Sequence, residues 1–350
     1  MDQLSMALSL PHPDTYSAYA FMERGGDLQK IIVKWRDPNP GEIVVKVLAC
    51  GICATDGILH TTALPVPIQF PRVPGHEIVG DVVAVSATET KWQLGQRVGA
   101  GWHGGHCHTC PRCVIGEYFT CSQVNINGIL RDGGYAEYIV LRSEAMVAVP
   151  RDLEPTEVAP LMCAGMTCFN SLRNMDAQVL EYVAIQGVGG VGHLGIQIAK
   201  AMGFRVIAIS SSGDKEAVAR ELGAHEYIDC SKVDPVQALQ ALGGAKVIMC
   251  TVPDIHAAMK LLPGLAVDGT LLPLTLEPEP IVIPPIALHP SRYAIKGWGA
   301  GVAKDIEACL TFAQAQNIRA IVETFPLDRA QEAYNCLTTA KFRAVIVPNL

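Results

Sequence analysis

The sequence of 350 residues lacks the features of a membrane protein, a secreted protein or a nucleic-acid-binding protein. No stretch reaches the roughly 18–20 uncharged apolar residues that a membrane helix needs. Residues 1–6 contain no basic segment and introduce no long apolar one, so a secretory signal is not expected. Basic residues are in deficit, with 27 Lys and Arg against 34 Asp and Glu, which argues against a nucleic-acid partner. These absences predict a cytoplasmic protein without membrane or nucleic-acid partners.

The sequence also contains no internal repeat and no low-complexity segment, and its length is sufficient for two domains. Before about residue 156, short β-branched runs at 43–48, 78–85 and 138–140 are separated by Gly and Pro, which predicts a barrel-like all-β domain. Beyond it, apolar strands alternate with helix-length segments, a pattern typical of a doubly wound parallel sheet. The strand candidates in this second part are 182–185, 205–209, 227–229, 247–250 and 269–272. The predicted fold class is therefore α/β.

Four of the twelve cysteines lie close together with the spacing C-x2-C-x2-C-x7-C, at Cys107, Cys110, Cys113 and Cys121. Zn²⁺ prefers four soft ligands in a tetrahedral arrangement, and this spacing provides them on a short loop. Two disulfides, or four unrelated thiols, are the alternatives. Disulfides are disfavoured in a chain with no sign of secretion. The spacing predicts a structural zinc lobe over residues 103–121.

A glycine-rich segment, residues 187–192, follows the strand candidate 182–185 and begins a helix through about Met202. Its pattern G-x-G-x-x-G allows a tight turn and lets a pyrophosphate approach the backbone N–H groups at the helix N-terminus. A turn that merely packs a helix is the alternative, and His193 is interpreted as a packing residue. The expected dinucleotide-binding residues are Gly187, Gly189, Gly190, Val191 and Gly192.

The end of the next strand candidate bears on which dinucleotide is bound. Enzymes that use NAD commonly have an acidic residue there, which holds the ribose hydroxyls. This chain has Ser210, Ser211 and Ser212 instead, followed closely by Asp214 and Lys215. Hydroxyls and an ammonium group can hold a 2′-phosphate, so NADP(H) is predicted, with NAD(H) possible. The alternative is that the serines only cap the following helix.

Three further candidate metal ligands are dispersed, at Cys53, His76 and Cys163, with Glu77 adjacent to His76. Such a set suits an open catalytic site, but spacing alone does not connect the three residues, and each has an ordinary alternative as a buried thiol or core histidine.

A family resemblance connects them. The segments Gly51-Ile52-Cys53-x-Thr55-Asp56, Gly75-His76-Glu77 and Cys163-Ala164-Gly165, the four-cysteine lobe and the glycine-rich loop occur in the order found in zinc-dependent medium-chain alcohol dehydrogenases. The resemblance extends from about residue 17 to 348. The serine tip with Lys215 resembles the cinnamyl alcohol dehydrogenase branch, and the short 122–135 loop resembles the yeast-type enzymes. Two cysteines and a histidine are the established ligand set of alcohol dehydrogenase itself, so their assignment here rests on this resemblance.

The resemblance implies a domain organisation. A GroES-like catalytic domain is expected at 1–160 and 301–350, because helix 303–316 and strand 344–347 would return to it, and a Rossmann domain at 161–300. Two zinc ions per subunit and a homodimer or homotetramer are also implied.

The resemblance further implies roles for individual residues. Cys53, His76 and Cys163 are the implied catalytic zinc ligands, and Glu77 is a carboxylate able to approach the metal. Asp56 is the implied partner that orients His76. The remaining implied roles are proton transfer by Thr55, cofactor pyrophosphate contact by Arg343, and substrate-pocket walls at Trp102 and Trp298, with core packing as the alternative for Trp102.

Two departures from the family pattern are present. Ala54 replaces the histidine that usually follows the first zinc cysteine, and Ile58 replaces the usual relay histidine. His60 is a possible substitute relay, with a surface histidine as the alternative. The expected function is NADP(H)-linked interconversion of an aldehyde or ketone with an alcohol. A biosynthetic reductase of C=C or C=N bonds is the first alternative, and a non-catalytic zinc- and nucleotide-binding protein is the second.

Overall fold

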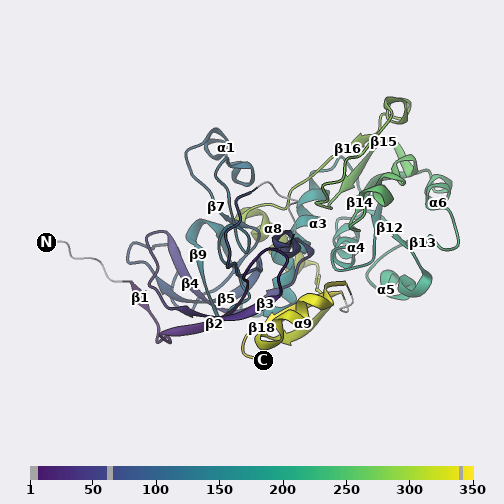
Figure 1. Cartoon of the computed structure of the whole chain (residues 1–350). Helices are drawn as coiled ribbons and strands as arrows, with labels where there is room; N and C mark the ends of the chain where they lie inside the picture. Colours follow the sequence, from purple (N-terminus) through teal and green to yellow (C-terminus); the bar gives the residue numbers. More distant parts are fainter. Residues whose placement is uncertain (1–6, 61–65, 339–341) are drawn as a thin grey trace. The chain divides into compact units, whose positions relative to one another are not determined.

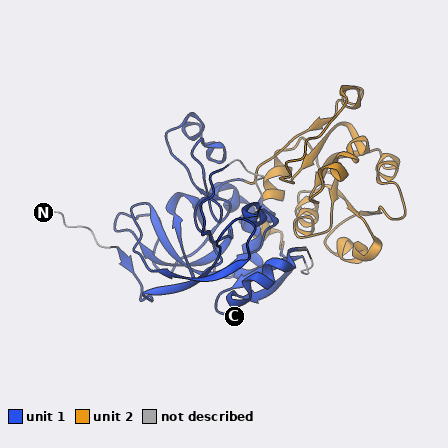
Figure 2. Ribbon diagram, viewed as in Figure 1, with its two compact units in different colours: residues 1–166, 301–312, 319–350 blue, residues 167–300, 313–318 orange. Residues whose placement is uncertain are grey.

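Residues 7–60, 66–338 and 342–350 are described by the computed structural model, and they form two units (Figures 1 and 2). Unit 1 comprises residues 1–166, 301–312 and 319–350, and unit 2 comprises residues 167–300 and 313–318. Residues 1–6, where no secretory signal is expected, lie outside the described residues. Among the helices of the described part, none combines the length and hydrophobicity that crossing a membrane would require.

The unit boundaries differ from the predicted ones at two short segments. Residues 161–166, predicted in the second domain, belong to unit 1, because the 3₁₀ helix η4 (Ala159–Met162) is fully buried against β4 (Glu42–Gly51) and β5 (Glu77–Val85). Residues 313–318, predicted in the first domain, belong to unit 2. Gln316 and Ile318 there share a surface depression with Gln197 and Lys200.

Unit 1 is built on a sheet in the order β10-β6-β5-β4-β18-β17, to which β1 and β9 add by pairing with β5 and β4. The remaining strands of the sheet are β1 (Leu8–Ser9), β6 (Arg97–Ala100), β9 (Tyr138–Arg142), β10 (Met146–Ala148), β17 (Val322–Pro326) and β18 (Arg343–Val347). Two separate pairs complete the unit, β2 (Thr15–Phe21) with β3 (Leu28–Lys34) and β7 (His103–Gly105) with β8 (Asn125–Ile126). The sequence prediction of strands near 43–48, 78–85, 138–140 and 344–347 is confirmed.

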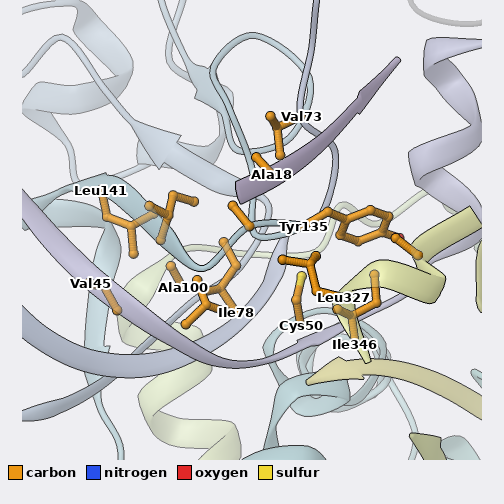
Figure 3. Packing of buried hydrophobic residues seen from close by; sticks show 14 of the residues in the cluster. Ala18, Val45, Cys50, Val73, Ile78, Ala100, Tyr135, Leu141, Leu327 and Ile346 are labelled. Carbon is orange, nitrogen blue, oxygen red and sulfur yellow. The ribbon is translucent and has the colours of Figure 1, made fainter. Parts of the chain in front are cut away.

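The core of unit 1 contains β-branched and aromatic side chains from strands far apart in the sequence. Figure 3 shows Val45, Ile78, Tyr135 and Ile346 among its members. Each fully buried aliphatic side chain contributes about 1.5–3 kcal/mol relative to an exposed one. Gly80 lets β4 and β5 pair closely, since a Cβ there would lie 2.2 Å from the Lys46 carbonyl oxygen. The short helices of this unit are α1 (Pro111–Val114), α2 (Pro155–Val158) and α9 (Ala330–Asn335).

Unit 2 contains a sheet of six strands, all paired in parallel, in the order β13-β12-β11-β14-β15-β16. The strands are β11 (Tyr182–Gln186), β12 (Arg205–Ser210), β13 (Glu226–Asp229), β14 (Ala245–Cys250), β15 (Leu265–Pro273) and β16 (Ala294–Ile295). Its interior positions are almost all apolar and buried, as expected when helices cover both faces. This order is that of the doubly wound dinucleotide-binding fold, and the predicted fold class is confirmed.

Four helices connect successive strands of the unit 2 sheet: α4 (Gly192–Ala201), α5 (Glu216–Glu221), α6 (Pro235–Ala241) and α7 (Ile255–Met259). A fifth helix, α3 (Ala164–Arg173), precedes the first strand of this sheet. The division between the units falls within α3 and within α8 (Ala303–Ala315). The strand order reverses between β11 and β14, and ligands of such sheets bind beyond the carboxyl ends of the strands at this point. The glycine-rich loop directly follows β11.

Candidate metal and nucleotide sites

The four cysteines of the lobe converge around one point. The Sγ atoms of Cys107, Cys110, Cys113 and Cys121 all lie within 4.8 Å of one another. Cys110 immediately precedes α1, whose single turn brings Cys113 back toward Cys107. Backbone N–H groups point at the sulfurs: that of Cys110 donates to Cys107 Sγ at 3.3 Å, and that of Gln123 donates to Cys121 Sγ at 3.3 Å.

These contacts favour the thiolate at Cys107 and Cys110, whereas burial and the neighbouring sulfurs raise the pKa of Cys113 to about 12. Backbone donors, including the N–H of Cys113, lower the pKa of Cys110 to about 5. All twelve cysteines, each among the described residues, are free of disulfides. Four converging sulfurs with their own N–H donors fit a tetrahedral Zn²⁺ of the structural kind.

The dispersed candidate ligands also converge, within unit 1. Ligand atoms of Cys53, His76, Glu77 and Cys163 lie within 4.8 Å of one another, and all four residues are buried. Cys53 follows β4, His76 and Glu77 are at the start of β5, and Cys163 follows η4. The pairing of β4 with β5 at Gly51 and Glu77 fixes the first two segments beside each other.

Asp56 holds the ligand-bearing segments together. Its Oδ1 lies 3.0 Å from Nδ1 of His76 and accepts the N–H of Gly75 at 3.2 Å. Its Oδ2 accepts the N–H of Cys53 at 3.1 Å. Burial lowers the pKa of His76, but the Asp56 carboxylate outweighs this and raises it well above its ordinary value. A carboxylate on Nδ1 directs Nε2 toward the remaining ligands, as expected for a metal-binding histidine.

Tyr135 is a member of this site that the sequence reasoning missed. Its hydroxyl donates to Asp56 Oδ2 at 2.9 Å, and the side chain is fully buried. Its ring lies against Gly75, where a Cβ would come within 2.5 Å of it, so the residue before His76 must be glycine. Gly75 also has a φ of +100°, which disfavours other residues. A tyrosine 79 residues from Asp56 leaves no local sequence signal.

Glu77 forms a buried ion pair with Arg343, whose guanidinium donates to Glu77 Oε1. Within this pair, Glu77 Oε2 and Arg343 Nε have no hydrogen-bond partner among the described residues. Arg343, on β18, is brought here by the pairing of Val345 with Gly51. The structure therefore places Arg343 against the ligand set, and its contact with a cofactor pyrophosphate remains a prediction.

The buried set fits a metal ion. Nε2 of His76 has no hydrogen-bond partner among the described residues, although it is buried. A thiol hydrogen bond from Cys163, together with His76, holds the pKa of Cys53 well below its ordinary value. An unpartnered imidazole nitrogen beside a thiolate and a second cysteine is the donor set expected for zinc with an open position.

Thr55 and Trp102 lie beside this set. Thr55 Oγ1 is 3.1 Å from Cys53 Sγ and is partly exposed. The ring of Trp102 meets that of His76 edge-on, with 5.1 Å between ring centroids. Trp102 also packs against the core, so both interpretations of this residue agree with its position.

The two positions near the expected proton relay differ in character. Ile58 is buried and apolar. His60 is partly buried rather than on the surface: its ring stacks on Tyr334 and meets Phe21 edge-on, and its Nε2 has no hydrogen-bond partner in the described part of the chain.

The glycine-rich loop of unit 2 has the geometry of a phosphate-binding turn. A Cβ on Gly192 would lie 1.8 Å from the Gly187 carbonyl oxygen, and Gly187 itself has a φ of +94°. A Cβ on Gly189 would meet nothing within 4 Å, so the backbone there is open to a ligand. Thr251, after β14, donates to the Gln186 carbonyl at 2.8 Å and secures the turn. His193 is fully buried, with Nδ1 3.2 Å from the Gly189 carbonyl.

The serine tip at the end of β12 has two charged neighbours that the sequence reasoning missed. Ser210 pairs with Asp229 of β13, and Asp229 forms an ion pair with Lys232 at 3.0 Å. These residues lie together because β12 and β13 are adjacent parallel strands. Their proximity could be predicted only if the order of the strands in the sheet were known. Ser212 donates to Asp214, and the Lys215 ammonium donates to the Val188 carbonyl at 2.9 Å, which ties the tip to the glycine-rich loop.

Trp298 belongs to unit 2, where Lys296 lies 4.9 Å from its ring centre. The metal-ligand set belongs to unit 1, so the predicted role of Trp298 in a substrate pocket remains a prediction.

Known proteins resemble this chain along nearly its whole length. Residues 39–151 match the family "Alcohol dehydrogenase GroES-like domain", and residues 190–315 match "Zinc-binding dehydrogenase". Alcohol dehydrogenase notN of Aspergillus sp. is 43% identical over 336 residues, which cover 95% of this chain and 98% of that protein.

Two solved structures agree with this assignment. The cinnamyl alcohol dehydrogenase SbCAD4 of Sorghum bicolor has a TM-score of 0.86 and 28% identity, covering 95% of this chain and 97% of its own. A zinc-binding dehydrogenase from Sinorhizobium meliloti, bound to NADP, has a TM-score of 0.86 and 25% identity, covering 96% and 100%. Given this similarity in sequence and fold, the chain belongs to the zinc-dependent medium-chain alcohol dehydrogenase family and is an oxidoreductase that acts on CH–OH groups.

Proposed function

We propose that this enzyme interconverts an aldehyde or ketone with the corresponding alcohol, using NADP(H) and a zinc ion held by Cys53, His76 and Cys163. The observation that carries the proposal is the convergence of these ligand atoms, with Glu77, within 4.8 Å in a buried site. A second zinc ion would be held by the four cysteines of the lobe, giving two per subunit.

When bound by these residues, zinc would supply Lewis-acid chemistry, which polarises a carbonyl group and stabilises developing negative charge. Asp56 keeps His76 in the tautomer whose Nε2 can bind the metal. The Thr55 hydroxyl, 3.1 Å from a ligand sulfur, is the group able to hold a proton beside a substrate oxygen. Trp102, against the His76 ring, provides an apolar wall.

The nicotinamide cofactor supplies the hydride. The glycine-rich loop would hold its pyrophosphate, and NADP(H) is favoured because β12 ends in serine rather than in a carboxylate. Lys232, beside Gly213, adds a positive charge near this tip, but Asp229 partly offsets it. The NADP bound to the Sinorhizobium relative agrees with this choice. Contact of Arg343 with the pyrophosphate would require its ion pair with Glu77 to open.

We also propose a homodimer or homotetramer in the cytoplasm. β16 lies at the edge of the parallel sheet, and Val282 and Ile286, which precede it, are 93% and 73% exposed. Exposed apolar side chains beside an open sheet edge are typical of an interface. Twelve free thiols agree with a reducing compartment. Light scattering on the purified protein tests the subunit number.

A reductase of C=C or C=N bonds is the second candidate. Ile58, buried and apolar at the usual relay position, favours it, because hydride addition to a cationic C=N group requires no proton on oxygen. The presence of all three ligands argues against a non-catalytic protein.

One experiment separates the candidates. NADPH oxidation by the purified protein is measured with an aldehyde, a ketone, an enal and an iminium ion, with zinc analysis of the same sample. Faster turnover of the aldehyde or ketone, with carbonyl-to-alcohol products, supports the proposal. Turnover restricted to the enal or the iminium ion contradicts it.

A further inference from the structure

A cavity of about 700 Å³ in unit 1 is lined by side chains that the proposed reaction does not use. It lies among β3, β9 and the segment that leads into the zinc lobe, and the described residues lining it include none of Cys53, His76 and Cys163. We call it the arginine cavity. Its cationic lining residues are Lys34, Arg36, Arg72, Arg131 and Arg142.

The carboxylates of the arginine cavity are fewer than its cations. The lining contains three carboxylates, those of Glu42, Asp132 and Glu144, against five cationic side chains. The cavity is therefore positively charged, whereas the chain as a whole carries a formal net charge of -7. Such a local reversal of sign attracts anions.

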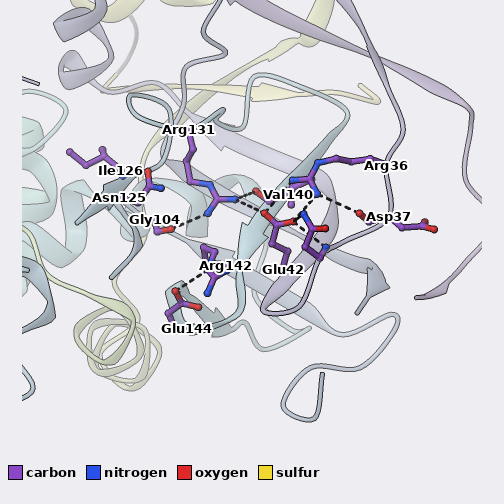
Figure 4. A network of polar contacts seen from close by, with 11 residues as sticks. Arg36, Asp37, Glu42, Gly104, Asn125, Ile126, Arg131, Val140, Arg142 and Glu144 are labelled. Carbon is purple, nitrogen blue, oxygen red and sulfur yellow. Dashed lines mark hydrogen bonds and ion pairs between the residues drawn. The ribbon is translucent and has the colours of Figure 1, made fainter. Parts of the chain in front are cut away.

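Glu42 is shared among several donors (Figure 4). It accepts from Arg36 at 2.7 Å and from both nitrogens of Asn39 at 3.0 and 3.1 Å. Arg131 approaches Glu42 only to 3.9 Å, beyond hydrogen-bond distance. Glu42 therefore neutralises Arg36 directly and compensates Arg131 only at longer range.

Arg131 is a buried cation held in place by backbone groups. Its side chain is 15% exposed, and it donates to the carbonyls of Gly104 at 3.1 Å and Val140 at 3.0 Å (Figure 4). Burial above all, with added repulsion from Arg142 and Arg36, lowers the pKa of Arg131. Carbonyl dipoles orient the guanidinium without cancelling its charge, so an anion nearby is stabilised.

Two cationic groups retain unused donors. Arg142 donates through Nε to Glu144 at 3.0 Å, and its two terminal nitrogens have no acceptor among the described residues. Lys34 has no ion-pair partner in the described part of the chain. Guanidinium and ammonium groups with free N–H bonds bind carboxylate and phosphate oxygens strongly.

We propose that the arginine cavity binds a small multivalent oxyanion, either a phosphate or a polycarboxylate, separately from the site of hydride transfer. Arg131 provides a fixed buried charge, while Arg142 and Lys34 provide the donors. Tyr16 and Tyr138, which meet edge-on with 5.5 Å between ring centroids, form an apolar wall suited to the carbon skeleton of an organic anion.

The test measures thermal stabilisation of the purified full-length protein by inorganic phosphate and by citrate, each against chloride at equal ionic strength. The variants are K34Q, R142Q and the double variant K34Q/R142Q. K30Q is the matched control, because Lys30 lies on the same strand as Lys34 and does not line the cavity. Phosphate could also bind the glycine-rich loop, so the part of the effect lost in K34Q/R142Q reports on the cavity.

We expect saturable stabilisation by at least one of the two anions, with an apparent Kd raised roughly tenfold in K34Q/R142Q and unchanged in K30Q. Binding of phosphate alone, or of citrate alone, assigns the class of anion. The proposal is overturned if chloride stabilises the protein equally, if neither anion does, or if K34Q/R142Q responds like K30Q. Lys34 is exposed, so K34Q alone keeps the test valid if the double variant unfolds.

Discussion

The hydroxyl of Tyr135 donates to Asp56 Oδ2 at 2.9 Å, while Asp56 Oδ1 lies 3.0 Å from Nδ1 of His76. A fully buried tyrosine thus acts on the metal-ligand set through the carboxylate that orients the histidine. Without the hydroxyl, Asp56 Oδ2 would retain only the N–H of Cys53. Tyr135 is accordingly a positioning residue.

Replacing Tyr135 by Phe should weaken zinc binding by roughly 10- to 100-fold, the usual effect of losing an outer partner of a metal ligand. The loss of a hydrogen bond to a charged group should also lower the free energy of unfolding by about 1.5–3 kcal/mol. Competition with a chelator measures the first effect, and calorimetry measures the second. Y334F is the control, because Tyr334 is nearby and its hydroxyl has no hydrogen-bond partner among the described residues. Equal zinc affinity in Y135F and Y334F would contradict the role of Tyr135.

Replacing Cys110 by Ser should destabilise the lobe and leave the chemistry per folded molecule unchanged. One missing thiolate uncouples metal binding from folding of residues 103–121, and we expect Tm to fall by roughly 5–10 °C with a lower zinc content. Cys230, exposed and outside both ligand sets, provides the control variant C230S. A C110S protein with the zinc content and Tm of C230S would refute the assignment of the lobe.

Replacing Ser210 by Asp should shift the preference from NADPH toward NADH by roughly 10- to 100-fold in kcat/KM, because a carboxylate repels the 2′-phosphate. The control is S210N, because asparagine has nearly the same shape as aspartate but carries no charge. It should shift the cofactor preference much less than S210D. Steady-state kinetics with both cofactors provide the measurement. A wild-type enzyme that already prefers NADH would show that the serine tip was misinterpreted, with Asp214 or Asp229 as the residues to examine next.

Replacing Thr55 by Val should lower kcat for a carbonyl substrate by roughly 10²–10⁴-fold, as expected when a general acid–base partner is lost. T55S, which keeps the hydroxyl, should retain most of the activity. H60A should have a small effect if water completes the proton path and a comparable effect if His60 is the relay. An active T55V enzyme would instead support the C=N reductase.

The lobe and the two nucleotide-site features were accessible from sequence because their residues are local. Four cysteines within 15 positions, or glycines between a strand and a helix, are a pattern that the chain carries by itself. The strand patterns likewise predicted five of the six strands of the unit 2 sheet, but only four of the eight strands of the unit 1 sheet. The set of Cys53, His76 and Cys163 is different, since only the resemblance to a family connected its members.

Contacts made by unrelated parts of the chain could not be predicted. Tyr135 reaches Asp56, and Arg343 reaches Glu77, only because the strands of unit 1 pair in a particular order. The arginine cavity has the same origin, because β3, β9 and the loops that carry Arg72 and Arg131 contribute separate cations. A single sequence without the fold contains no signal for such groupings.

The pairing of β18 with β4 has a consequence for biosynthesis. Arg343 and Glu77 are 266 positions apart, so a ribosome makes Glu77 long before it makes the arginine that neutralises it. Until β18 has been made and has paired with β4 at Gly51, the Glu77 carboxylate lacks the arginine that pairs with it, and β4 lacks this neighbouring strand. Loop closure over such a span is slow, and the earlier-made unit 2 can fold in the meantime. The buried ion pair beside the metal ligands can therefore form only after β18 has been made and has paired with β4.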